Sequence, residues 1–191
     1  MPKLLFSRSL SVFSRWVLRL WGFRVVGSIP TDAQKKWLLT TAPHTSNWDF
    51  VLCVIVRSAV ELKVNYVAKE SLFKAPHGWF FSWLGGYPVK RAKNQHYVET
   101  IADLYRQLDE FRLLIMPEGT RKKVDKFRTG FYYIALSANI PLILFTLDWG
   151  NRVVSFAEPF WPTGDVEKDM AFIYSHFRGV RGRVPENSIG V

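Results

Sequence analysis

The sequence predicts an α/β fold, a layered domain with a mixed, largely parallel sheet flanked by helices and preceded by an N-terminal amphipathic helix. Short apolar runs of strand length alternate with longer segments that have helical periodicity, and strands separated by helices usually pair in parallel. The 191 residues suffice for one domain with a substantial core. A hydrophobic content of 48% with 22% charged residues is ordinary globular composition and excludes a disordered chain.

Residues 1–24 are predicted to be a membrane-associating segment that precedes a domain over residues 25–191. No acidic residue occurs before Asp32, whereas lysine and arginine are spread through the stretch. Ser11, Ser14 and the arginines recur at spacings of three and four residues, which predicts a polar stripe opposite leucine, phenylalanine and tryptophan. This pattern is typical of a helix that lies on an anionic membrane surface. The alternative is a helix packed on its own domain with its arginines in water.

The chain is expected neither to cross a membrane nor to be exported. Arg8, Arg15 and Arg19 interrupt the apolar run that a secretory signal needs. The longest uncharged apolar stretches, 50–56 and 79–89, are shorter than the roughly 18–20 residues of a spanning helix. We therefore expect a peripheral, monotopic protein on the cytoplasmic face of a membrane.

In the first half of the domain, residues 37–41 form a short apolar run that predicts a strand. A Pro-His-Thr-Ser-Asn loop leads from it into helical periodicity over 48–62. Residues 63–68 and 87–89 are predicted strands, and 79–84 is a predicted short helix that ends at a pair of glycines.

In the second half, the helix predicted over 94–110 has the clearest periodicity, since apolar residues between Val98 and Leu108 recur at three and four positions. The remaining elements continue the alternation: strand 111–116, helix 130–139, strands 141–147 and 153–156, and helix 165–177.

The net charge of +10 indicates an anionic partner, which could be nucleic acid, an anionic membrane or a phosphorylated substrate. No nucleic-acid-binding motif accompanies the charge, so nucleic acid is not expected as a partner. The single cysteine, Cys53, excludes an internal disulfide, and four scattered histidines offer no metal-ligand spacing. Neither a metal nor a cofactor is expected.

The loop after the first predicted strand contains His44 and Asp49, separated by four residues. Ser46 or Asn47 is a natural N-cap, which places Asp49 in the first helical turn, where the helix dipole favours negative charge. His44 can fold back to bond Asp49 through one ring nitrogen and leave the other free to accept a proton from a substrate hydroxyl. The alternative is a loop histidine beside an aspartate that serves only the helix terminus.

A second block, Glu118-Gly119-Thr120-Arg121, directly follows the strand predicted over 111–116. It therefore lies at the carboxyl end of a strand, where α/β sheets bind ligands. Gly119 lets the backbone turn and approach a ligand closely. Arg121 offers a planar fork suited to a phosphate, whereas the lysines that follow are expected to be a solvated charge run.

A third block covers residues 85–91, in which two glycines and a proline precede Lys90 and Arg91. This composition suggests a shaped turn that presents the Arg91 guanidinium to an anion. Taken alone, the block is equally compatible with any basic hairpin.

In their order along the chain, these blocks resemble those of the glycerolipid acyltransferase family, the group that contains bacterial 1-acylglycerol-3-phosphate acyltransferases. The resemblance spans residues 44–143, about half of the chain, and includes a fourth, apolar block, Ile140-Pro141-Leu142-Ile143. It implies an enzyme of phospholipid biosynthesis that transfers an acyl group to the free hydroxyl of a lysophospholipid, foremost 1-acylglycerol-3-phosphate. The donor would be the thioester of acyl-CoA or acyl carrier protein.

The resemblance also implies roles for individual residues. His44 would be the general base and Asp49 its orienting partner. Arg91 and the block Glu118-Gly119-Thr120-Arg121 would bind the acceptor, with Arg91 and Arg121 as the clamp on its phosphate. Glu118, which would repel a phosphate, would position the loop that it shares with Gly119 and Thr120. The proline block would bind the acyl donor or shape the site.

Departures from the family pattern leave the exact acceptor open. Pro43 replaces a common asparagine, residues 87–90 replace a more aromatic stretch, and Lys122 replaces a common serine. Another lyso-lipid, such as a lyso-amino-acid lipid, is therefore an alternative acceptor. A basic protein that binds lipid or nucleic acid without catalysis is the alternative outside enzymes.

Overall fold

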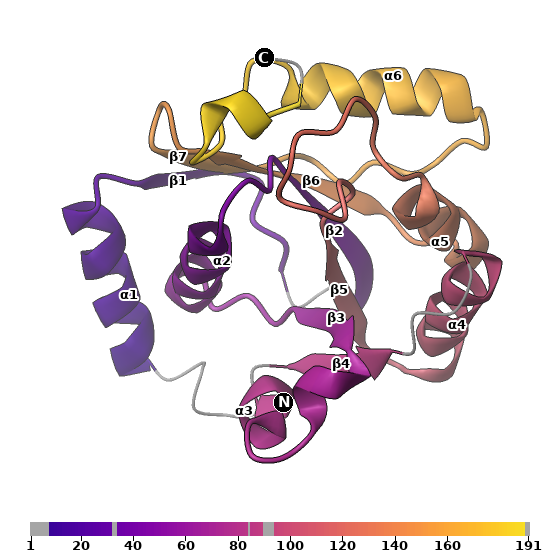
Figure 1. The fold of residues 1–191 in the computed structure, drawn as a ribbon, viewed down its shortest axis with the longest axis horizontal. Helices are drawn as coiled ribbons and strands as arrows, with labels where there is room; N and C mark the ends of the chain where they lie inside the picture. The colour runs from indigo at the N-terminus through magenta and orange to yellow at the C-terminus, as the bar shows by residue number, and fades with distance from the viewer. Residues whose placement is uncertain (1–7, 32–33, 84, 90–93, 190–191) are drawn as a thin grey trace.

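A computed structural model describes residues 8–31, 34–83, 85–89 and 94–189, and in these residues the predicted α/β architecture is present (Figure 1). The strands are β1 (Arg24–Gly27), β2 (Lys36–Ala42), β3 (Asn65–Lys69), β4 (Gly86–Val89), β5 (Phe111–Ile115), β6 (Leu142–Asp148) and β7 (Val153–Phe156). The α-helices are α1 (Arg8–Leu20), α2 (Asn47–Ala59), α3 (Gly78–Trp83), α4 (Asn94–Gln107), α5 (Gly130–Ala138) and α6 (Val166–Phe177). Two short 3₁₀ turns are η2 (Glu70–Phe73) and η3 (Pro185–Asn187).

The strands form one sheet in the order β1-β7-β6-β2-β5-β3-β4. All neighbouring strands pair in parallel except β6 and β7, which are antiparallel. Side chains alternate between the two faces of β2: Leu38 packs with α4, α5 and α6, whereas Trp37 and Leu39 pack with α1 and α2. The sheet thus has a separate core layer on each face, as Figure 1 shows for the helices.

The predicted elements agree closely with the observed ones, but β1 was not predicted. This strand lies at the edge of the sheet, pairs in parallel with β7 and leaves most of its side chains exposed. An edge strand with two exposed faces lacks the apolar alternation from which strands are recognised.

Helix α1 packs against α2, but not in the predicted way. Ser11 and Ser14 are buried together with Leu18, and Arg15 Nε donates to the Ala59 carbonyl oxygen at 2.8 Å. The predicted polar stripe therefore faces α2 rather than water, because the small serine side chains form the packing surface and Arg15 bonds the backbone beside them. The apolar side is outward, with four exposed residues: Val12, Phe13, Trp16 and Leu20. None of the described helices has the length and apolar character to cross a bilayer.

Candidate active site

The candidate site lies at one edge of the sheet, at the carboxyl ends of three adjacent parallel strands. β2 lies between β5 and β6, and all three end at the same edge. His44 follows β2, Glu118 follows β5 and Trp149 directly follows β6. Because ligands in α/β sheets bind beyond the carboxyl ends of the strands, this edge is where a site is expected.

The predicted contact between His44 and Asp49 is present. Ser46 is the N-cap of α2 and forms a capping box with Asp49, so the carboxylate lies in the first helical turn. The His44 Nδ1 atom is 3.1 Å from Asp49 Oδ2. A carboxylate only accepts hydrogen bonds, so Nδ1 carries the hydrogen and Nε2 of the neutral ring is free to accept a proton.

The Asp49 carboxylate is fully buried and surrounded by donors. Oδ2 accepts from the backbone N–H groups of Thr45 and Ser46 at 2.7 and 2.8 Å, in addition to His44. Oδ1 accepts from Trp149 Nε1 at 2.8 Å. These donors fix the carboxylate in one orientation and compensate the cost of burying its charge.

Glu118 supports the same loop from β5. It is buried, and its Oε2 accepts from the His44 backbone N–H at 2.7 Å. Burial raises the pKa of Glu118 to about 7; the bond from His44 opposes this shift, and the nearby Asp49 charge adds to it. The prediction that Glu118 positions its loop is compatible with this geometry, which also connects it to the backbone of His44.

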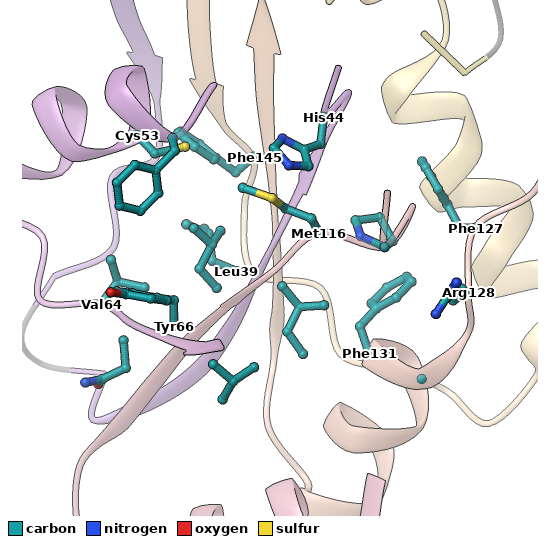
Figure 2. A pocket seen from close by; sticks show the side chains of 18 of the residues that line it. Leu39, His44, Cys53, Val64, Tyr66, Met116, Phe127, Arg128, Phe131 and Phe145 are labelled. Atoms are coloured by element: carbon teal, nitrogen blue, oxygen red, sulfur yellow. The ribbon is translucent and has the colours of Figure 1, made fainter. Parts of the chain in front are cut away.

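A large cavity opens beside His44. Its volume is about 1920 Å³, and it continues from the mouth into the space between α2 and the sheet. Figure 2 shows Leu39, Val64 and Phe145 among the side chains that line its interior. The mouth is polar, with six residues in its wall: His44, Asn47, Gly119, Thr120, Arg121 and Arg128. The arrangement therefore places a candidate base where a polar mouth meets a mainly apolar interior, which Arg57 and Asn65 also line.

Two arginines line the mouth. Arg121 donates to the Asn47 side chain at the start of α2, which holds its guanidinium beside the His44 loop. Arg128 packs over Gly119, whose φ of +64° is a conformation that favours glycine. Arg91, the other predicted phosphate ligand, lies outside the described residues.

Two further sequence features take no direct part in the cavity chemistry. Burial raises the pKa of the Cys53 thiol, with a contribution from Asp49, so this side chain is not an activated nucleophile. The apolar block around Pro141 begins β6, and its isoleucines and leucine are buried in the core rather than in the cavity wall. No group of metal-binding side chains is assembled within the described ranges.

Comparison with known proteins assigns the family. The sequence model of the family described as Acyltransferase matches residues 23–147, well over half of the chain. The chain belongs to the acyltransferase family. The match includes the His44 loop and the Glu118 block, which are segments that form the site.

Characterised relatives and a solved structure agree with this assignment. The chain is 28% identical over 145 residues to a 1-acyl-sn-glycerol-3-phosphate acyltransferase of Haemophilus influenzae, covering 71% of this chain and 59% of the relative. It is 28% identical over 141 residues to an enzyme of the same name from Saccharomyces cerevisiae, covering 69% of this chain and 45% of the relative. The chain thus spans about half the length of these relatives.

The fold also matches that of the 1-acyl-sn-glycerophosphate acyltransferase PlsC from Thermotoga maritima. The TM-score is 0.56 at 19% sequence identity, and the match covers 88% of this chain and 74% of the other. This similarity supports the α/β architecture described above.

Sequence reasoning missed two residues of the site. Trp149 lies 100 positions from Asp49, and only the parallel pairing of β2 with β6 brings them together. Its position directly after a predicted strand was the available signal. Arg128 is not singled out among the cations that follow Arg121, although its side chain lines the cavity.

Proposed function

We propose that this protein transfers a fatty acyl group from the thioester of acyl-CoA or acyl carrier protein to the free hydroxyl of a lysophospholipid. The foremost acceptor is 1-acylglycerol-3-phosphate. The observation that carries the proposal is the contact between His44 Nδ1 and Asp49 Oδ2 at the mouth of a deep apolar cavity. The names of the curated relatives support the same acceptor.

In the proposed reaction, His44 Nε2 takes the proton of the acceptor hydroxyl as its oxygen attacks the thioester carbonyl. Asp49 stabilises the imidazolium that forms and keeps the ring oriented. The tetrahedral intermediate then expels the thiolate, which receives the proton from His44 and leaves as a thiol. The carbon–sulfur bond is replaced by an ester bond, and the imidazole returns to its neutral form.

The interior of the cavity suits a long acyl chain. Its wall between α2 and the sheet consists mainly of apolar side chains such as Leu39, Val56 and Phe145. Transfer of apolar surface from water to such a wall is favourable by about 25 cal/mol for each Å² buried. A fatty chain bound there would place its carbonyl end at the polar mouth, next to His44.

The mouth suits a phosphate. Arg121 and Arg128 present guanidinium groups there, and such groups form charge-assisted, often bidentate bonds with phosphate oxygens. We extend the proposal to Arg91 as a third phosphate ligand, on the basis of the sequence resemblance. The acceptor would then bind with its phosphate on the arginines and its hydroxyl toward His44.

The proposal includes peripheral binding to an anionic membrane, from which a lipid acceptor would reach the mouth. The outward apolar residues of α1 and the basic residues of the N-terminal segment support this location. α1 would lie in the membrane surface with Phe13 and Trp16 facing the lipid.

The purified chain should be tested with a panel of acceptors and both donors, with the acylated products identified by mass spectrometry. The panel contains 1-acylglycerol-3-phosphate, lyso-lipids whose phosphate is a diester, and a lyso-amino-acid lipid. We expect a diacyl product and free thiol in equal amounts, with the fastest turnover for the phosphate monoester. Vesicle binding without product from any acceptor would instead identify a non-enzymatic lipid-binding protein.

A further inference from the structure

We infer that Trp149 is a positioning residue for the His44–Asp49 pair: its indole N–H holds one oxygen of Asp49 and so sets the orientation and proton affinity of His44. The inference rests on the proposed function only in that the pair is taken as catalytic. Trp149 belongs to none of the sequence blocks that carry the family resemblance.

The contact is buried and direct. Trp149 Nε1 donates to Asp49 Oδ1 at 2.8 Å, and both side chains are shielded from water. The other oxygen, Oδ2, already has His44 and two backbone N–H groups around it. Within the described residues, Trp149 is the donor that the structure provides for Oδ1, so the two oxygens have distinct partners.

The indole ring is itself held firmly. Trp21 and Phe23, which follow α1, meet it edge to face with ring centroids 5.5 and 5.1 Å away. The Arg183 guanidinium lies 5.2 Å from its centroid. Segments from both ends of the chain therefore fix the ring in place, and its N–H has one fixed direction.

Loss of the N–H would change the proton affinity of His44. A buried carboxylate oxygen without a donor leaves the Asp49 charge less compensated. The pair would then hold a proton on the imidazole more strongly, and the carboxylate would be freer to rotate away from its alignment with Nδ1. Both changes reduce the fraction of well-placed neutral imidazole at neutral pH.

Several other titratable or charged groups of the described residues lie near the His44–Asp49 pair and bear on a titration of His44. Glu118 bonds the His44 backbone, and Cys53 lies one helical turn after Asp49 on α2. Arg183 lies against the Trp149 ring, and Arg121 bonds Asn47 at the start of α2. Of these groups, Arg183 contacts the ring that Trp149→Phe changes, and phenylalanine keeps an aromatic face for it.

The test compares Trp149→Phe with Trp37→Phe as a matched control. Trp37 is equally enclosed, but its indole N–H has no acceptor in the described part of the chain. Both substitutions remove the same atoms from a packed interior, so both lower stability. In Trp149→Phe we expect kcat to fall about tenfold, because hydrogen bonds to charged groups are among the stronger ones.

The deciding readout is independent of turnover. The His44 ring is titrated by NMR, and its midpoint should move upward by about half a pH unit or more in Trp149→Phe and stay unchanged in Trp37→Phe. The acid limb of the pH–rate profile should move in the same direction. Equal midpoints in wild type and Trp149→Phe would overturn the inference even if activity fell, because a structural role alone would give that result.

If Trp149→Phe does not fold, a second variant, Asp49→Asn, is used instead, and the NMR resonance of the Trp149 indole N–H is measured in it. The resonance should shift relative to wild type, since its acceptor changes from a carboxylate to an amide, and an unchanged resonance would overturn the inference. Both NMR measurements observe the side chains themselves and not the product of the reaction. They therefore remain decisive even if His44→Ala proves active and the catalytic assignment fails.

Discussion

Glu118 is a site residue whose ionisation depends strongly on its surroundings. Its pKa is raised from 4.5 to about 7 in the folded protein, chiefly because the carboxyl group is buried. A raised pKa for an acid means that the folded state binds the proton more tightly than the unfolded state does. The free energy of folding that this tighter proton binding contributes is fully present below about pH 4.5 and is lost as the pH rises to about 7.

Glu118→Gln should remove this pH dependence while keeping an oxygen acceptor for the His44 N–H. From pH 4.5 to 8, the free energy of unfolding of the variant should rise relative to wild type by about 2–3 kcal/mol, as expected for a shift of this size. Urea unfolding across this range measures the difference. The control is Glu70→Gln at an exposed position, whose free energy of unfolding should depend on pH as that of wild type does. The same pH dependence in Glu118→Gln as in wild type would contradict the assignment.

Arg121→Ala should weaken use of a phosphate acceptor by about 10- to 100-fold in kcat/KM, because a charge-assisted bond is lost. The KM of the donor should change little. Arg121→Lys should recover part of the loss, since an ammonium cannot present the same planar fork. Lys122→Ala, a neighbouring exposed cation outside the cavity wall, is the matched control. Equal losses for Arg121→Ala and Lys122→Ala would point to a general field effect rather than a bound phosphate.

Residue-level prediction succeeded where the partners are close in sequence. His44 and Asp49 share one loop and one helical turn, so their contact follows from helix capping and spacing. Trp149 and Glu118 reach the same loop only through strand pairing across long sequence separations. Their partners could not be assigned before the strand order was known.

At the level of elements, α2 contributes both to the His44–Asp49 contact and to the cavity wall. Its first turn contains Asp49, and Phe50, Cys53 and Val56 along the same helix line the cavity. In the proposed reaction, one helix would thus orient the base and form a wall for the acyl chain. The buried serines of α1 pack against this same helix, so the outward side of α1 is left for another partner.

The double substitution Phe13→Ser and Trp16→Ser should weaken binding to anionic vesicles at least tenfold, since each buried aromatic side chain contributes roughly 1.5–3 kcal/mol. The two side chains are 58% and 56% exposed, so the fold should remain intact. Co-sedimentation with vesicles that contain phosphatidylglycerol measures the change.

The control for this test is Trp161→Ser with Phe172→Ser, a pair that is similarly exposed at 54% and 49% near α6. α6 lies along a different side of the molecule from α1 in Figure 1. Equal loss of vesicle binding in both double variants would contradict a specific role for α1.

The order and type of the elements were predictable because apolar periodicity survives in buried strands and helices. The face by which α1 packs could not be predicted in this way. Serine counts as a polar residue in a hydropathy pattern, although it is small enough to be buried between two helices. β1 has too few buried side chains to leave a pattern. The sequence therefore predicts buried elements well and edge or surface elements poorly.

Across the whole molecule, the fold brings segments that are far apart in sequence to one edge of one sheet. The His44 loop, the Glu118 block and Trp149 meet there because β2 lies between β5 and β6. The same edge opens into a cavity with apolar walls and a basic mouth. This combination is what the proposed acyl transfer to a phosphorylated lipid requires.

The most direct test of the account is the rate of acyl transfer by His44→Ala, measured as diacyl product formed from labelled acyl thioester and 1-acylglycerol-3-phosphate. A positioned general base contributes about 10²–10⁴ in rate, so we expect a loss in that range with circular dichroism and thermal unfolding close to wild type. Asp49→Asn should also be slow, and the double variant little slower than His44→Ala, because the two residues act as one unit. Transfer by a folded His44→Ala within a few-fold of wild type would contradict the account.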